Sequence, residues 1–325
     1  MSIHTQDERW QADRYSLDVE LRNVSDVISI VQTAEGAMAE ASNILYRMLD
    51  LAKMSSRGPP SDRISIQEEI TALNSELNRI AETTSFAGKT LLDGSFGKQS
   101  FRIGESSGET VVLTLGNIRS DSVEMGGKAY VAQNAASPDW VVTTNTDLSL
   151  DYTAKLGGAK SITLQAQQGD RLQDVAAYIS GQSDDVEAFV GEGGKLQIFA
   201  STQKVDGEIT IGGNLGTELD FGAAKDVTVA DIDVTTGGNQ QAIAFLDGAL
   251  KAVHSQRAAL GALQNRLSHL INNLSSIDAA RGRISDADFA EKTAALTKSQ
   301  ILAQASASIL AQAKETPSSV LSLLQ

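Results

Sequence analysis

Residues 241–280 read QAIAFLDGALKAVHSQRAALGALQNRLSHLINNLSSIDAA, and this stretch decides the fold. Its apolar residues fall on two series with seven-residue spacing, which is the pattern of a helix that packs along its whole length. The stretch contains no proline, so the spacing predicts one helix about 60 Å long. Arg257 and Gln264 interrupt one series and are expected to fix the register of the packing. The predicted seam residues are Leu246, Leu250, Val253, Leu260, Leu267, Ile271 and Leu274.

Two further helices of suitable pattern precede this rod. Residues 17–52 carry apolar side chains at seven-residue intervals, and the Gly58-Pro59-Pro60 sequence ends that helix. A shorter helix follows over residues 62–84, with apolar residues alternately four and three apart. Because helices of matched length can bury one another's apolar faces, the sequence predicts an antiparallel bundle.

The middle of the chain has a different character. Residues 101–115 alternate like a hairpin around a turn at 104–108. Between residues 117 and 231 the chain is rich in Gly, Thr, Val and Asp and offers short alternating segments, with one helical stretch at 172–179. The predicted fold is therefore mainly α: a long antiparallel helical bundle, or coiled-coil stem, that carries a β-rich α+β insertion domain.

The C-terminal region predicts a break and a final helix. Residues 281–288 are predicted to form a capped break in the helix. An Ala- and Ser-rich helix is predicted to follow the break and to end at Pro317. Small side chains bury little apolar area, so this segment is expected to be disordered in the monomer until a partner covers it. Its expected partner-facing residues are Phe289, Leu296, Ala303 and Leu310.

Composition and charge exclude several classes of function. The formal net charge is -14 and no basic stripe occurs, which argues against a nucleic-acid partner. The chain has no cysteine, so disulfides and thiolate chemistry are excluded. It shows no apolar segment of signal-peptide or membrane-spanning length, so a product without a cleaved signal peptide and without membrane insertion is expected.

No pattern points to catalysis, a cofactor or a metal. His254 and His269 lie 15 residues apart, too far to share one metal on a helix. The acidic pairs at 184–185 and 231–233 are typical of solvated loops. The glycines of 191–194 lack the Lys-Ser/Thr that a phosphate loop requires and are typical of a hairpin turn. The sequence therefore predicts a protein that is not an enzyme.

Several motifs, taken together and in order, resemble bacterial flagellin, the subunit of the flagellar filament. They are ISIVQTAEGA at 28–37, RIAETTSF at 79–86 with LLDG at 91–94, LGALQNRL at 260–267, ISDADFA at 284–290 and VLSLL at 320–324. The resemblance covers about residues 17–116 and 232–325. Residues 161–221 also resemble a small insertion module found in flagellins and hook-associated proteins.

The resemblance implies a division of the chain. Residues 17–116 and 232–286 would form the helical stem and hairpin, residues 117–231 the outward insertion, and residues 287–325 an inner helix that lines the tube. It also implies extracellular location in the flagellum after flagellar type III export, polymerisation with other flagellin subunits, and a chaperone on the C-terminal segment. The innate vertebrate receptor for flagellin would contact Arg47, Leu51 and Glu69.

Two departures from the family pattern affect the expected function. Residues 1–16 are charged and do not resemble the usual opening, so the N-terminal inner helix is expected to be missing or replaced. Ala87 stands where the family usually has an asparagine. Because an unpaired tube-lining helix gains little burial to offset its ordering entropy, we expect a minor or assembly-impaired subunit that polymerises poorly alone.

Two other functions remain open on the sequence. One is a soluble helical-bundle protein that uses its insertion as a binding module, such as an adhesin or a regulator of export. The other is the hook–filament junction protein, which shares the terminal helices. The number of flagellin motifs on the stem favours the filament subunit over both.

Overall fold

The computed structural model describes residues 3–103, 110–134, 140–191, 194–236 and 239–322. The chain divides into two compact units, one formed by Asn23–Asn265 and the other by Met1–Arg22 with Arg266–Gln325. The predicted fold class is confirmed: long helices carry a β-rich insertion.

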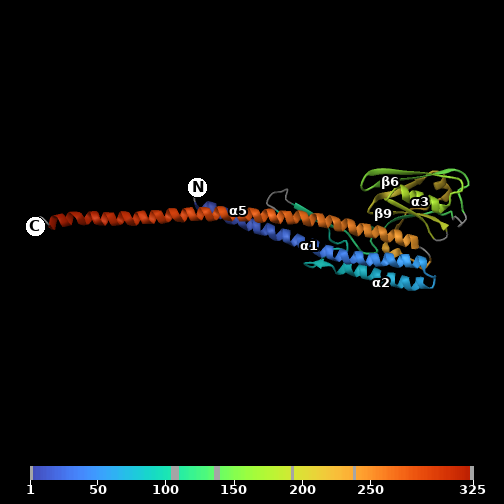
Figure 1. Cartoon of the computed structure of the whole chain (residues 1–325), viewed down its shortest axis with the longest axis horizontal. Coiled ribbons are helices and arrows are strands. Elements are labelled where there is room, and N and C mark those ends of the chain that lie inside the picture. Colours follow the sequence, from blue (N-terminus) through green and yellow to red (C-terminus); the bar gives the residue numbers. More distant parts are fainter. Residues whose placement is uncertain (1–2, 104–109, 135–139, 192–193, 237–238, 323–325) are drawn as a thin grey trace. The chain divides into compact units, whose positions relative to one another are not determined.

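Three long helices account for the predicted bundle. They are α1 (Ile3–Arg57), α2 (Asp62–Thr83) and α5 (Asn239–Ser322). In the unit 23–265, α1 lies beside both α2 and the beginning of α5 (Figure 1). The contacts run in opposite directions along the paired helices, so both pairs are antiparallel, as the sequence predicted.

The predicted break at residues 281–288 is wrong. α5 continues through Gly282 and also through Pro317, and it ends at Ser322. A glycine in a helix interior costs only about 1 kcal/mol relative to alanine. The flanking stretches are rich in Ala and other good helix formers, which outweigh that cost.

Two small antiparallel pairs follow α2. β1 (Ser85–Phe86) and β2 (Lys89–Thr90) are joined by Ala87 and Gly88, both with positive φ (48° and 79°). Left-handed backbone suits Asn or Gly better than Ala, so the alanine at position 87 strains this turn. β3 (Gly97–Arg102) pairs with β4 (Thr110–Leu115), which confirms the predicted hairpin. Its predicted turn at 104–108 lies outside the described residues.

The described residues of the insertion form two antiparallel sheets and two α-helices. The strand orders are β10–β6–β7 and β11–β5–β9–β8. Helix α3 (Leu172–Gln182) includes the predicted helical stretch, and α4 (Asn214–Leu219) is a single short turn of helix. The strands are β5 (Gly127–Val131), β6 (Thr146–Ala154), β7 (Gly158–Ala166), β8 (Val186–Val190), β9 (Leu196–Ser201), β10 (Val205–Gly212) and β11 (Lys225–Val227).

A separate apolar core stabilises the insertion. Alternate residues of β6 and β7 point inward and meet the buried face of α3. At roughly 25 cal/mol per Å² of buried apolar surface, such a core supplies the main stabilisation of the sheets. Its central residues include Leu148, Leu150, Ile162, Leu164, Val175, Ile179, Val186 and Ile198.

Candidate functional site

The seam of the stem is the most completely buried surface of the unit 23–265. On α1 the apolar residues at seven-residue intervals, and those three positions after them, are buried, most of them fully. A seam of this kind excludes water from the apolar side chains that form it. The buried α1 residues from the two series are Val24, Val27, Val31, Ala34, Met38, Ala41, Leu45 and Met48.

α5 presents the predicted seam residues as expected, with one partial exception. Leu246, Leu250, Val253 and Leu260 are buried in the unit 23–265. In the other unit Leu267 and Leu274 are buried, and Ile271 is only partly buried. The sequence therefore located this seam closely.

Polar contacts fix the register between α1 and α5. The buried hydroxyl of Ser55 lies 2.6 Å from Asn239 Oδ1 at the start of α5. Further along, Tyr46 and His254 approach with ring centroids 6.0 Å apart. Because a buried acceptor without a donor is costly, the Ser55–Asn239 contact disfavours a shifted register.

The three residues expected to contact the innate receptor do not share one environment. Arg47 on α1 lies 2.7 Å from Glu69 on α2, and both side chains are about half exposed. Leu51 is only 2% exposed. Leu51 therefore packs inside the unit 23–265 instead of beside the exposed Arg47–Glu69 pair, and the receptor contact of the three residues stays a prediction.

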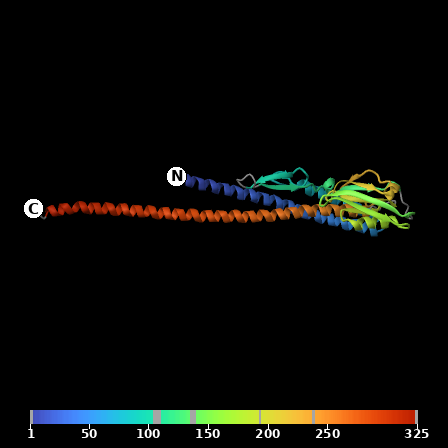
Figure 2. The ribbon, with the colours of Figure 1, turned by 90° about the horizontal axis from the view of Figure 1, so that it is seen from above.

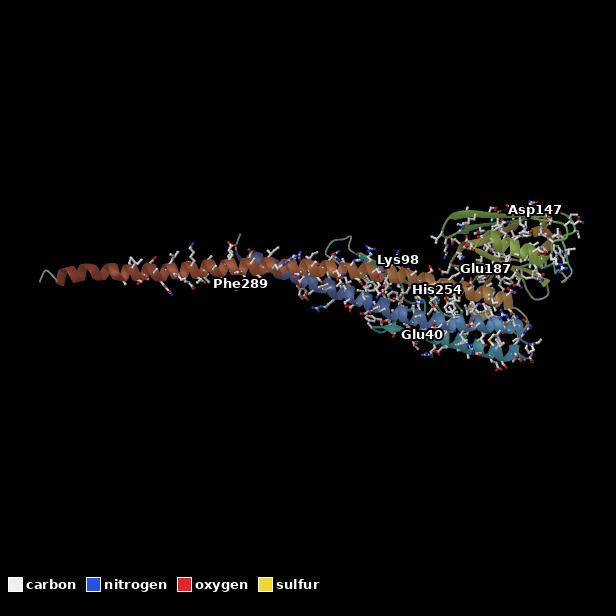
Figure 3. All side chains as sticks on the ribbon, viewed as in Figure 1. Glu40, Lys98, Asp147, Glu187, His254 and Phe289 are labelled. Atoms are coloured by element: carbon white, nitrogen blue, oxygen red, sulfur yellow. The ribbon has the colours of Figure 1, made fainter. Side chains whose placement is uncertain are left out.

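The later part of α5 has the opposite character. Every described side chain from residue 283 to residue 311 is exposed. Phe289 is 74% exposed and Leu296 is 60% exposed, and Ala303 and Leu310 are exposed as well. Figure 3 labels Phe289, whose ring projects from the helix. The structure shows this C-terminal segment as helix. The disorder expected for the segment in the free monomer stays a prediction.

This exposed segment offers an apolar surface. Phe289, Ala290, Thr293, Ile301 and Leu302 line a shallow groove along the helix. Soluble proteins rarely leave contiguous apolar surface uncovered, and such surface marks sites of interaction. The arrangement can bind another apolar helix.

The residues weighed for chemistry have structural roles. Lys160 Nζ lies 2.6 Å from Asp185 Oδ2, and this hydrogen bond lowers the pKa of the Asp185 carboxyl. The Asp231 carboxylate accepts from the backbone N–H and the hydroxyl of Thr228 and so caps a short helix, η3 (Val229–Asp231). Within the described part of the chain, no group of three metal-ligating side chains occurs.

Membrane insertion was also tested against the helices. Among the described residues, no helix combines the length and the apolar character needed to cross a membrane. Lys298 is among the residues that line the groove on the exposed segment of α5.

Family models match most of the chain. The flagellin N-terminal helical region matches residues 2–97, the flagellin C-terminal helical region matches residues 243–324, and the flagellin hook IN motif matches residues 147–202. The first match begins at residue 2 and so includes most of residues 1–16, which the motifs alone had left outside the resemblance.

Relatives agree with these matches along nearly the whole chain. Flagellin B of Vibrio anguillarum is 59% identical over 315 residues, which cover 95% of this chain and 84% of that relative. Polar flagellin A of Vibrio parahaemolyticus is 57% identical over 323 residues, which cover 97% and 86%. The long helical stem with its insertion and the matching family models together define a flagellar filament-type protein. The chain belongs to the flagellin family.

Solved structures resemble the chain more loosely. FliC from Burkholderia pseudomallei is 24% identical, covers 74% of this chain and 99% of its own, and gives a TM-score of 0.43. Bacillus cereus flagellin is 18% identical, covers 78% and 88%, and gives a TM-score of 0.40.

Sequence reasoning missed the polar residues that hold the insertion. Gln67, Asn74 and Asn78 on α2 bond to backbone atoms of the two segments that connect stem and insertion. Their spacing of seven and four residues marks one face of α2. That signal was present in the sequence, but a polar face is ordinarily read as solvated.

Proposed function

We propose that this chain is a structural subunit of a bacterial flagellar filament and serves motility. Its membership of the flagellin family supports this function. The observation that carries the proposal is the exposed apolar surface on α5 around Phe289 and Leu296, in a chain whose stem seam is largely buried. A stem that buries its own seam and a helix that leaves its apolar side chains exposed are what a polymerising subunit requires.

The proposed division of labour follows from this contrast. Residues 17–116 and 232–286 form the stem, residues 117–231 form an outer insertion, and residues 287–325 form the inner segment that binds other flagellin subunits. The net charge of -14 and the character of the relatives favour a structural role over nucleic-acid binding or catalysis.

Co-sedimentation tests the proposed function. The purified chain would be mixed with monomers of a related Vibrio flagellin, polymerised, and centrifuged. We expect the chain to appear in the pellet with the filaments and in their walls by electron microscopy. A chain that stays in the supernatant at every mixing ratio would contradict incorporation.

We further propose that a flagellar export chaperone binds the C-terminal segment before type III export to the cell exterior. Phe289, Leu296, Ala303 and Leu310 supply exposed apolar side chains at seven-residue intervals, which suits a helical binding groove. Titration calorimetry with a flagellar chaperone should show binding that Leu296→Asp weakens at least tenfold. The variant Glu291→Gln serves as the control, and equal weakening by both would contradict the proposal.

We also propose a contact with the innate flagellin receptor, which involves fewer residues than the sequence analysis named. It rests on Arg47 and Glu69, which form an exposed pair, and excludes the buried Leu51. In a receptor reporter assay we expect Arg47→Glu to weaken the response. Arg79→Glu is the matched control, since Arg79 is also exposed and ion-paired on this helix pair. Equal responses from both variants would overturn the contact.

A further inference from the structure

The four-stranded sheet of the insertion contacts the first turns of α5. Phe199 on β9 and Phe245 on α5 are both buried, with ring centroids 4.9 Å apart. Lys251 Nζ lies 3.0 Å from Glu187 Oε1 on β8 and also pairs with Asp247. Burial by itself lowers the pKa of Lys251, but the hydrogen bonds to Asp247 and Glu187 outweigh it and raise that pKa. Figures 1 and 2 agree in placing the sheet against α5, and Figure 3 labels Glu187 at this contact.

Gly248 permits this close approach. A Cβ at Gly248 would lie 3.2 Å from Phe199 Cε1 and 3.5 Å from Ser201 Oγ. The first distance is shorter than ordinary van der Waals contact, so a side chain here must displace the Phe199 ring. Gly261 lies on the same helix and has nothing within 4 Å of its would-be Cβ. The two glycines therefore form a matched pair, since helix propensity favours alanine equally at both.

A second attachment holds the segment that leaves the stem. Asn78 Oδ1 on α2 accepts a hydrogen bond from Ser120 N at 2.8 Å. One turn further along α2, Glu82 forms an ion pair with Arg119. Arg119 also bonds both carboxylate oxygens of Asp121 at 2.9 Å. This network binds the outgoing segment to α2 through backbone and side-chain atoms.

The same helix holds the returning segment. Gln67 Nε2 donates to Ile232 O at 3.0 Å, and Gln67 Oε1 accepts from Val234 N at 2.9 Å. Asn74 Nδ2 donates to Val229 O at 3.3 Å. Amide side chains can satisfy a backbone donor and acceptor at once, which makes them suited to binding a segment without regular structure.

We propose that these two attachments hold the insertion in one orientation on the stem. The two connecting segments also bond to each other, since Ala230 N donates to Ser120 O at 3.0 Å. The insertion is thus fixed at α2 through its connections and at α5 through its sheet. If the stem packs into the filament as proposed above, each subunit itself sets the direction in which its insertion faces outward. The fixed orientation can be tested on monomers and does not depend on assembly.

Distance measurement between spin labels tests the fixed orientation. The chain has no native cysteine, so labels can be placed at Glu40→Cys on α1 and Leu156→Cys on the exposed β6–β7 hairpin. We expect a single narrow distance distribution for the monomer at low temperature. A broad or multimodal distribution would overturn the proposal, whatever the outcome of the filament experiments.

The glycine pair tests what fixes the orientation. We expect Gly248→Leu to broaden or shift the distance distribution and to lower the melting temperature, because the side chain displaces Phe199. Gly261→Leu should leave the distribution unchanged and raise or preserve the melting temperature. If Gly248→Leu fails to fold, Gly248→Ala against Gly261→Ala gives the same comparison. Identical behaviour of the two positions would show that the contact at Gly248 does not set the orientation.

Discussion

The first and last parts of α5 carry the same seven-residue spacing but differ in what covers them. Up to Asn265 the helix buries Leu246, Val253 and Leu260 within its own unit. From residue 283 onward the corresponding side chains, such as Phe289 and Leu296, are exposed. Because any helical partner can pack against residues with this spacing, the spacing predicts that a partner exists but not which one. Only the structure separates a partner inside the chain from one outside it.

Introducing a charge at an apolar position should give the largest difference in stability between the two regions. Leu260→Asp places a carboxylate at a position that is 2% exposed. The loss should be at least the roughly 2–5 kcal/mol of a buried Leu to Ala change, with carboxylate desolvation added. Leu296→Asp, at an exposed position, should change stability by less than about 0.5 kcal/mol. Urea unfolding followed by circular dichroism measures both, and equal losses would abolish the distinction.

The accuracy of the sequence predictions follows the same division. The α1 series around Met38 and Leu45 and the α5 series around Leu260 were located correctly, because a helix buried on one face must repeat its apolar residues. The α3 helix was also found from its pattern. The turn at Ala87 has a positive φ although alanine disfavours it, which no spacing can reveal.

Other features could not be derived from the sequence. The break expected around Gly282 failed because one glycine is a weak signal against long runs of helix-forming residues. Leu51 lies on neither seven-residue series of α1, so the spacing did not show that its side chain is buried, as the structure has it. The contact between Phe199 and Phe245 joins residues 46 positions apart, and no local pattern predicts which sheet face meets which helix turn.

A buried hydrogen bond tests the covered part of α5, and its removal should have an effect on stability of intermediate size. Ser55→Ala removes a hydroxyl that lies within bonding distance of Asn239 Oδ1 on α5 and of Ala52 O on its own helix. We expect a loss of about 1–3 kcal/mol. Ser42→Ala is the matched control, because this buried hydroxyl bonds only to Met38 O on its own helix. Its loss should stay below about 1 kcal/mol. Comparable losses would mean that the Ser55 contact does not bind the helices together.

The insertion is a third region, with its own core. The smallest effect on stability is expected there, from the ion pair between Lys160 and Asp185. Since Lys160 lowers the pKa of Asp185, the folded carboxyl ionises more readily than the unfolded one. Its contribution is present above the unfolded value and is lost as pH falls from about 4. We expect Asp185→Asn to cost at most about 1 kcal/mol at neutral pH, because Lys160 is substantially exposed.

The pH profile decides whether this pair acts as described. The stability difference between wild type and Asp185→Asn should shrink as the pH is lowered from about 5 to about 2. Lys160→Gln should give the same profile, since it removes the other partner. A difference that does not change with pH would show that the ion pair contributes nothing to the stability of the insertion.

The central claim is that the seam around Leu260 folds the subunit while the exposed surface around Leu296 assembles it. The most direct measurement is co-sedimentation of Leu296→Asp with filaments of a related flagellin, alongside its unfolding curve. We predict an unfolding curve that matches wild type and a loss of at least tenfold in the pelleted fraction. A Leu296→Asp variant that enters filaments as well as wild type does would contradict the claim.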